Sequence, residues 1–445
     1  MHIIIIGAGK VGYSLAEKLS REQHDIFLID HNENRLETVQ ENLDVSTILG
    51  PGGNIYTLQE AGVAEADLLL AVTNAEEVNI LACLLGGQMG VKRTVARVSN
   101  PEYVENGPFE ISSFGIDLMI NPEMVTAESI LKLIRVPEAL NVEYFANRRV
   151  QLLELSVDKD SPIVGKTLYE LDFDHSYLIV AVMRNGKIVI PHGSDKIEPD
   201  DLIFVMARTE DMLAVEEFLG KRREKARDIT ILGGGKLGYQ LAKILEKKDF
   251  NVKLIEKQIK RCQWLSEKLE KTQIINGDGT DLNLLESEDI ASSDIFAAMT
   301  GDDKANILVS LLVKHLGVPR TISQLRRSDY VPLVEKLGID VAVSPRMLTA
   351  GAIMKFIRRG KILSVTFLEG DRAEMLELIA PSEGRIINKP LKELKLPRGM
   401  IIGAICRGDE VIVPGGNDFI GPGDLIIIFA LPQAIAQIEK IFDGR

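Results

Sequence analysis

The chain opens with the stretch His2-Ile-Ile-Ile-Ile-Gly7-Ala8-Gly9-Lys10-Val11-Gly12, an apolar run followed by three glycines in G-x-G-x-x-G spacing. The apolar run predicts a buried strand, and the residues that follow it predict a helix beginning at Lys10. In such a turn the first glycine permits a sharp bend. The second lets a pyrophosphate approach the backbone, and the third lets the helix pack closely on the strand. The motif alone is weak evidence, because many sequences contain it.

The second feature of the sequence is a repeat of this motif. It recurs 226 residues later as Gly233-Gly234-Gly235-Lys236-Leu237-Gly238. Asp30, which ends the second predicted strand, has its counterpart at the same offset in Glu256. Residues 154–219 likewise match residues 377–442. A match of this extent with small drift indicates an internal duplication.

Each repeat divides into a larger and a smaller segment. The larger segment alternates short apolar runs with helical patterns, which predicts a doubly wound parallel sheet. The smaller segment predicts an α+β module with a type I′ hairpin turn at Asn185-Gly186 and a short helix at 168–171. The predicted fold class is therefore α/β, a tandem duplication of a Rossmann-like lobe followed by a small module. The expected parts are lobe 1 (1–135), module 1 (140–225), lobe 2 (226–358) and module 2 (362–445), with the charged stretch 221–228 as linker.

Composition narrows the possible classes of function. A chain of 445 residues has room for several cores, and 52 basic against 65 acidic side chains give a charge of −13. This charge argues against a bulk electrostatic grip on nucleic acid or on an anionic bilayer. The longest apolar run near the C-terminus, 425–431, is far shorter than a membrane helix, and no export signal is expected. Cys83, Cys262 and Cys406 lie far apart, which favours a reducing compartment without disulfides or a cysteine zinc site.

The glycines and the acids together predict a nucleotide site in each lobe. A helix that begins at the glycine motif offers free N–H groups and a partial positive charge to phosphate oxygens. Asp30 and Glu256 are expected to accept hydrogen bonds from ribose hydroxyls and to repel a 2′-phosphate, which favours NAD or an adenine nucleotide over NADP. We expect that the glycines and the acid occur in both copies for ligand binding, because packing alone does not require them.

The two copies differ at the end of the third strand. Lobe 2 has Gly277-Asp278-Gly279-Thr280, where Asp278 is expected to cap the next helix or to touch the adenine, whereas lobe 1 has Gly50-Pro51-Gly52-Gly53. Arg97 on the fifth strand has Gln324 as its counterpart, which places a positive charge in one copy only. We therefore expect two sites of unequal affinity. The candidate cofactor-binding residues are Gly7, Ala8, Gly9, Lys10, Val11, Gly12, Asp30, Thr73, Asn74 and Arg97 in lobe 1, and Gly233, Gly235, Lys236, Leu237, Gly238, Glu256, Gly277, Asp278, Thr300 and Asp302 in lobe 2.

Taken together, these features resemble the RCK/KTN regulators of potassium transport. The small module adds Ile401-Ile-Gly-Ala-Ile-Cys-Arg-Gly and Pro422-Gly-Asp424 to the resemblance, which covers essentially the whole chain. It implies NAD(H) and ATP or ADP as ligands and a ring of such chains, usually a homotetramer. It also implies a peripheral place on the inner face of the cell membrane, beneath an integral-membrane, Trk-type potassium-translocating subunit. Catalysis, nucleic acid binding and membrane insertion are not implied.

Alternative classes of function leave some trace in the sequence. An NAD-dependent oxidoreductase needs a proton-transfer group, and no histidine recurs at matching positions of the two units. The stretch 164–167, Val-Gly-Lys-Thr, is like the end of a P-loop but has Asp160 where the upstream glycine belongs. His175 with Asp172 and Asp174 offers a weak metal site without a counterpart, so no metal is predicted. An interaction scaffold without ligands is the remaining alternative.

Two helical patterns close the larger segments. They cover 124–134 and 347–357, and each joins a lobe to its module. Their apolar faces pack either between the lobes or within the core of one lobe, and the pattern leaves both arrangements open.

Overall fold

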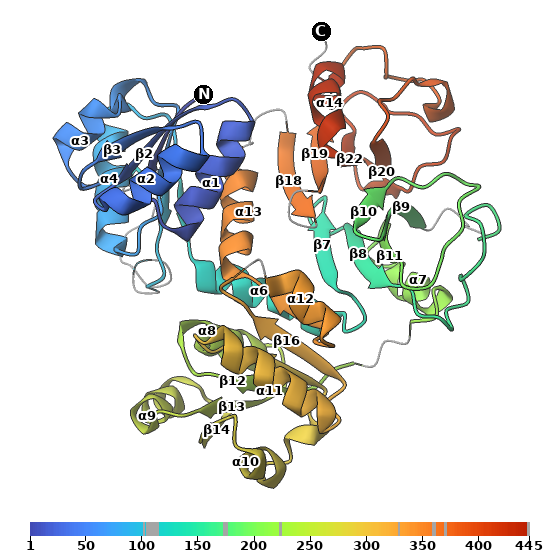
Figure 1. The fold of residues 1–445 in the computed structure, drawn as a ribbon. Coiled ribbons are helices and arrows are strands. Elements are labelled where there is room, and N and C mark those ends of the chain that lie inside the picture. The colour runs from blue at the N-terminus through green and yellow to red at the C-terminus, as the bar shows by residue number, and fades with distance from the viewer. Residues whose placement is uncertain are drawn as a thin grey trace.

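The computed structural model describes residues 1–100, 103, 115–171, 177–221, 225–327, 330–357, 362–368 and 372–442. They form two parallel sheets wrapped by helices and two smaller antiparallel sheets (Figure 1). The α/β fold class expected from the sequence is confirmed. In the described part of the chain, no helix combines the length and the apolar character needed to cross a membrane.

Lobe 1 is built around a six-stranded parallel sheet in the order β3-β2-β1-β4-β5-β6. Strand order reverses between β1 and β4, so that both strands end at the crevice where such sheets bind ligands. The isoleucines of β1 are at most 1% exposed, because helices cover both faces of the sheet. The elements are β1 His2–Ile6, α1 Lys10–Arg21, β2 Asp25–Asp30, α2 Glu33–Asn42, β3 Ser46–Leu49, α3 Ile55–Glu60, β4 Leu68–Ala71, α4 Glu76–Gln88, β5 Thr94–Arg97, β6 Leu118–Ile120 and α6 Pro122–Arg135.

Lobe 2 repeats this architecture. Its strands lie in the order β14-β13-β12-β15-β16-β17, which matches lobe 1 strand for strand. Its elements are β12 Asp228–Leu232, α8 Lys236–Glu246, β13 Asn251–Glu256, α9 Ile259–Lys268, β14 Gln273–Asn276, α10 Leu282–Ser287, β15 Ile295–Ala298, α11 Asp303–His315, β16 Arg320–Gln324, α12 Val331–Lys336, β17 Val341–Val343 and α13 Pro345–Ile357.

Each module is a five-stranded antiparallel sheet with a helix. Asn185 and Gly186 both have positive φ, at 52° and 74°, so the predicted type I′ turn is confirmed. The strand orders are β10-β9-β11-β8-β7 and β18-β19-β22-β20-β21. The elements are β7 Asn141–Phe145, β8 Val150–Ser156, β9 Tyr177–Arg184, β10 Lys187–Val189, β11 Leu202–Arg208 and α7 Met212–Phe218, then β18 Ile362–Leu368, β19 Ala373–Ile379, β20 Met400–Arg407, β21 Glu410–Ile412, β22 Leu425–Ala430 and α14 Ile435–Phe442.

The prediction of a short helix at 168–171 is wrong, because this segment is a turn. The backbone N–H of Leu168 donates to the carbonyl of Asp195, and that of Tyr169 donates to the carbonyl of Gly193. Thr167 donates its N–H and its hydroxyl to Glu170. The bonds to Asp195 and Gly193 tie this turn to the neighbouring loop, and only Glu170 and Leu171 donate back to the carbonyl of Thr167.

The closing helices α6 and α13 are exchanged between the lobes (Figure 1). Ile130 and Leu133 of α6 join the core that contains Leu237 and Leu241 of α8, in lobe 2. Conversely, α13 packs on α1 and joins the core of lobe 1. The two helices also contact each other. Of the two arrangements left open by the sequence, packing between the lobes is the one found.

Two arginines hold the exchanged helices at their C-terminal ends. Arg93 of lobe 1 donates to the carbonyl of Ile357 at 3.0 Å, and its guanidinium lies over the ring of Phe356. Its counterpart Arg320, at the start of β16, donates to the carbonyl of Ala139, just after α6. Burial of the Arg320 guanidinium lowers its pKa. Each lobe therefore binds the segment that leads into the module of the other unit.

The two modules pack on each other across a shared apolar core. Phe204 and Phe429 meet at its centre, with ring centroids 6.0 Å apart. At the edges, Arg149 donates to the carbonyl of Gly408 at 2.5 Å, while its counterpart Arg372 donates to that of Gly186 at 3.0 Å. The two lobes are thus joined to each other by the exchanged helices, and the two modules are joined to each other by their shared core.

Candidate functional site

Two glycines of each motif are explained by the fold. Gly7 has φ of +107°, a conformation that L side chains rarely adopt. A Cβ at Gly12 would lie 1.8 Å from the carbonyl oxygen of Gly7, so any side chain there would push the helix off the turn. Gly233 and Gly238 repeat both features, with φ of +101° and a distance of 1.9 Å.

The middle glycine of each motif has no such explanation. A Cβ at Gly9 or at Gly235 would meet no atom within 4 Å, and neither residue has positive φ. Both residues are the N-caps of helices, α1 and α8, that have no side-chain cap. Open space in front of an uncapped helix N-terminus suits an anion.

The acids bind the glycine loops. Asp30 is 5% exposed and accepts from the N–H of Ala8 at 2.6 Å and from that of Asn32 at 2.9 Å. Glu256 accepts from Gly234 N–H at 2.8 Å and from Gln258 N–H at 2.7 Å. The assumption that the acids have no structural task is therefore wrong, because they tie each loop to the second strand. Each carboxylate oxygen keeps a lone pair for a further donor.

Two asparagines at matching positions of the repeat organise the other side of the sites. Asn79 is fully buried on α4, accepts from the N–H and the hydroxyl of Thr73 at 2.9 and 2.7 Å, and donates to the carbonyl of Arg97. Asn306 makes the same bonds to Thr300 and Gln324 in lobe 2. Each asparagine fixes the ends of the fourth and fifth strands, and its repetition in an identical context was the available signal.

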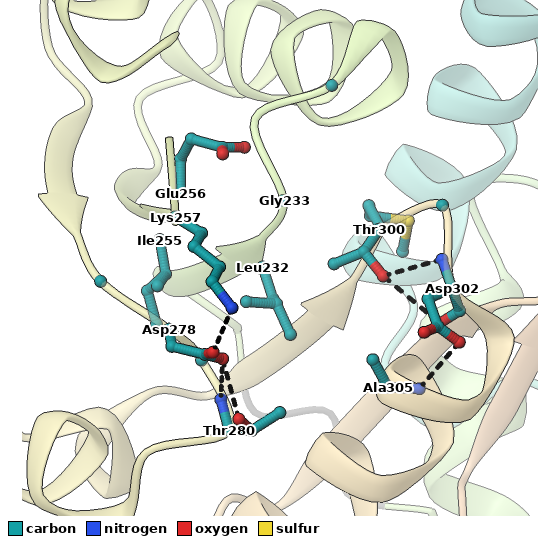
Figure 2. A pocket seen from close by; sticks show the side chains of 15 residues that line it. Leu232, Gly233, Ile255, Glu256, Lys257, Asp278, Thr280, Thr300, Asp302 and Ala305 are labelled. Carbon is teal, nitrogen blue, oxygen red and sulfur yellow. Dashed lines mark hydrogen bonds and ion pairs between the residues drawn. The ribbon is translucent and has the colours of Figure 1, made fainter. Parts of the chain in front are cut away.

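Lobe 2 contains a cavity of about 440 Å³ at the carboxyl ends of its strands (Figure 2). It brings together seven of the ten residues expected for this site, whereas Lys236, Leu237 and Gly238 in the first turn of α8 are not part of its wall. The lining residues are Leu232, Gly233, Gly235, Ile255, Glu256, Lys257, Gly277, Asp278, Gly279, Thr280, Met299, Thr300, Gly301, Asp302 and Ala305.

Asp278 does not cap the following helix. That helix, α10, begins at Leu282, and Asp281 caps it by accepting from Asn283 N–H. Asp278 instead accepts from the N–H and the hydroxyl of Thr280, at 3.0 and 2.8 Å, and pairs with Lys257 at 2.8 Å. The lysine and the threonine hold the pKa of Asp278 at about 2, below its usual range. The alternative role at the adenine stays a prediction.

Positive side chains stand at both sites. In lobe 1, Arg97 donates to Asn74 at 3.0 Å, which places both at the edge of the crevice. In lobe 2 the guanidinium of Arg326 lies 2.8 Å from where a Cβ of Gly301 would be. The expectation of a positive charge in one copy only is therefore wrong, because Arg326 replaces the charge missing at Gln324.

Two further arginines, not anticipated from the sequence, lie beside the acids. Arg35 on α2 approaches Asp30 at 3.6 Å. Its counterpart Arg261 on α9 donates to the carbonyl of Gly234 at 2.6 Å and stacks on Trp264, 3.9 Å from the ring centroid. Trp264 is the single tryptophan of the chain.

One ion pair joins the two sites. Lys236, which follows the second glycine loop, lies 3.5 Å from Glu76 in the first turn of α4 in lobe 1. Glu76 also accepts from Asn100 N–H at 2.8 Å. The neighbourhood of the second loop therefore contacts the neighbourhood of the first crevice.

Metal binding finds no support in the described part of the chain, where no three His, Cys, Asp or Glu side chains gather. The weak candidate His175 with Asp172 and Asp174 lies outside the described residues. The P-loop-like stretch 164–167 ends in the turn described above and opens no helix.

Comparison with known proteins identifies the family. The TrkA-N domain model matches residues 3–122 and 229–345, and the TrkA-C domain model matches 152–220 and 375–443. The chain is 38% identical to "Trk system potassium uptake protein TrkA homolog 2" of Methanosarcina mazei, over 99% of this chain and 100% of the relative. It is 36% identical to TrkA of Halomonas elongata, over 99% and 98%. A structure titled "GsuK channel bound to NAD" has a fold similar to the whole chain, with a TM-score of 0.64, 20% identity and 79% of that chain covered. The chain therefore belongs to the TrkA family, as a tandem of TrkA-N and TrkA-C domains.

Proposed function

We propose that this chain is a cytoplasmic subunit that regulates an integral-membrane, Trk-type potassium-translocating subunit in response to nucleotides. The observation that carries the proposal is the open space at Gly9 and Gly235. Packing explains the other two glycines of each motif, while the middle one leaves room for a ligand at a helix N-terminus. The names of the curated relatives supply the connection to potassium uptake.

The proposed ligands are NAD(H) and ATP or ADP. The cavity in lobe 2 lies between the glycine loop, Glu256 and Thr300, as an adenosine followed by a pyrophosphate requires. No histidine or cysteine is among its lining residues. The acids and the lysine that line it are already bonded: Glu256 to the glycine loop, Asp278 to Lys257, and Asp302 to the start of α11. We therefore propose binding rather than catalysis. The NAD in the GsuK channel is consistent with the first ligand.

The exchanged helices suggest how occupancy changes shape. The helix α8 follows the second glycine loop and packs on α6, which leads into module 1. The helix α1 follows the first loop and packs on α13, which leads into module 2. A ligand shifts such an equilibrium only by its differential affinity for the two states. We propose that each nucleotide acts on the opposite unit's module, within a ring of four chains.

Titration calorimetry with NADH, NAD, ATP and ADP tests the binding. Wild type is expected to bind at two sites. Gly9→Val and Gly235→Val are each expected to weaken the affinity of one site by at least about tenfold, because the valine side chain fills the space for the ligand. Gly351→Val on α13, another glycine with nothing within 4 Å of its Cβ position, is the matched control. Wild type that binds none of the four nucleotides would establish the scaffold alternative.

The membrane partner is tested by affinity capture from detergent-solubilised membranes. The expected result is co-purification of an integral potassium-translocating protein, in an amount that changes when the nucleotide changes. Measurable hydride transfer from NADH to simple carbonyl substrates would contradict the regulatory proposal.

A further inference from the structure

The ion pair between Lys257 and Asp278 lies across one wall of the lobe 2 cavity. Lys257 directly follows Glu256 at the end of β13, and Asp278 follows the end of β14. Figure 2 shows the lysine extending from its strand towards the aspartate, whose carboxylate it meets at 2.8 Å. Both residues line the cavity together with Glu256.

The position of Asp278 is fixed independently of the lysine. One carboxylate oxygen accepts from both the N–H and the hydroxyl of Thr280, which leaves the other oxygen for Lys257. Hydrogen bonding to Asp278 also raises the pKa of Lys257, so both groups stay charged at neutral pH. The ammonium group is therefore held by a preset partner.

A lysine in this place has a chemical consequence. In dinucleotide-binding lobes the acid after the second strand binds the ribose, and a nearby cation instead accommodates a 2′-phosphate. The cavity contains both, because Glu256 and Lys257 are adjacent. Arg261 also lies near Glu256 but is bonded to the glycine loop and is not a lining residue. Lys257 is thus the cation best placed to meet a phosphate on the ribose.

We propose that Asp278 holds Lys257 away from the ribose, so that the lobe 2 site accepts NADH and rejects NADPH. This inference rests on the proposed nucleotide binding. The wall then carries two carboxylates against one ammonium group, and a 2′-phosphate meets net negative charge. Specificity of this kind comes from repulsion of the wrong ligand as much as from contacts to the right one.

Lobe 1 is built differently at both positions. His31 stands where lobe 2 has Lys257, and Pro51 stands where it has Asp278. Proline offers no carboxylate, so the pair is specific to the second site. The preference against a 2′-phosphate in lobe 1 depends on Asp30 alone.

The test measures NADH and NADPH at the second site through energy transfer from Trp264, which stacks on Arg261 beside that glycine loop. Wild type is expected to show transfer to NADH and at least about tenfold weaker affinity for NADPH. Asp278→Asn, which frees the lysine, is expected to strengthen NADPH binding about tenfold while NADH affinity stays within about twofold. Adding Lys257→Met to that variant is expected to abolish the gain.

The matched control is Asp249→Asn, which removes one carboxylate from another exposed lysine pair of lobe 2, Lys271–Asp249 at 3.5 Å. It should leave the NADPH to NADH ratio unchanged. An unchanged ratio in Asp278→Asn, or a gain that persists without Lys257, would overturn the inference. Absence of transfer to NADH in folded wild type would contradict the proposed function instead.

Discussion

The two glycine loops make the same hydrogen bond with different residues. In lobe 1 the N–H of Ala8 donates to Asp30, and in lobe 2 the N–H of Gly234 donates to Glu256. A Cβ at Gly234 would lie 3.1 Å from the Glu256 carboxylate and 2.4 Å from a methyl group of Leu265. The lobe 1 counterpart of Leu265 is the smaller Val39.

Three positions differ together between the lobes. In lobe 2 a longer acid and a larger apolar residue stand where a methyl group of the loop would be. The hydrogen bond from loop to acid is present in both lobes, although all three residues differ. Constraint therefore lies on the geometry of the loop rather than on particular side chains.

Elsewhere the lobes are unequal. The helix α11 is capped by Asp302, which accepts from the N–H groups of Lys304 and Ala305, whereas Ala75 at the start of α4 makes no side-chain cap. Lobe 2 alone has the Lys257–Asp278 pair. At these two positions lobe 2 has side-chain contacts that lobe 1 lacks, and the unequal affinities of the two sites stay a prediction.

The largest expected effect comes from substituting the third glycine of each motif, whose close approach to the carbonyl of the first glycine is common to both lobes. Gly12→Ala and Gly238→Ala each force a Cβ against a carbonyl oxygen at under 2 Å, so each should lower the free energy of unfolding by about 3 kcal/mol. Urea unfolding measures the loss. Gly9→Ala and Gly235→Ala are the controls, with losses under about 1 kcal/mol, because the added methyl group meets nothing. A large loss in one lobe alone would show that the loops are not equivalent.

A second experiment converts one loop into the other. Gly234→Ala should lower the free energy of unfolding by about 2 kcal/mol, since its methyl group contacts Glu256 and Leu265. Adding Glu256→Asp and Leu265→Val should restore stability to within about 0.5 kcal/mol of wild type. In lobe 1, Asp30→Glu beside Ala8 should reproduce the crowding. Failure of the triple variant to recover would show that the three positions are independent.

The smallest effect concerns pH. The pKa of Asp278 is about 2 in the folded protein, below the ordinary value, so the carboxylate stabilises the fold above about pH 4 and this contribution disappears as the pH falls towards 2. Since Asp278 is 42% exposed, the contribution should stay under about 1 kcal/mol. The difference in unfolding free energy between wild type and Asp278→Asn should therefore vanish across that interval. High salt should shrink it at neutral pH, and a difference that grows on acidification would contradict the assignment.

Much of the fold could be predicted because its signals are local. The strands of the parallel sheets are buried on both faces and appear as apolar runs, and glycines mark the turns after them. Strand β7 could not be predicted in this way, because its hairpin turn has no glycine: Ala146, Asn147 and Arg148 all adopt positive φ. Such a turn is rare for these residue types and leaves no pattern in the sequence.

The site could be predicted where the two repeats have the same type of residue at matching positions. It could not be predicted where it depends on contacts between different helices and strands. Glycines and acids stand at fixed spacing, so they could be named in advance. Arg326 replaces the charge of Arg97 from a position two residues further along, which a residue-by-residue comparison of the copies does not detect. The apolar faces of α6 and α13 were visible, but not which lobe each would cover, because that depends on the whole chain path.

The helix exchange has a consequence for stoichiometry. If each unit were a separate polypeptide, α6 and α13 would still have to pack on the lobe of another unit. Two first units or two second units could then pair as readily as one unit of each kind. Joining the units in one polypeptide makes every exchanged pair a mixed one, with one lobe of each kind. The covalent link therefore acts as an obligate heterodimer would. It fixes the ratio of the two crevices at one to one in every molecule.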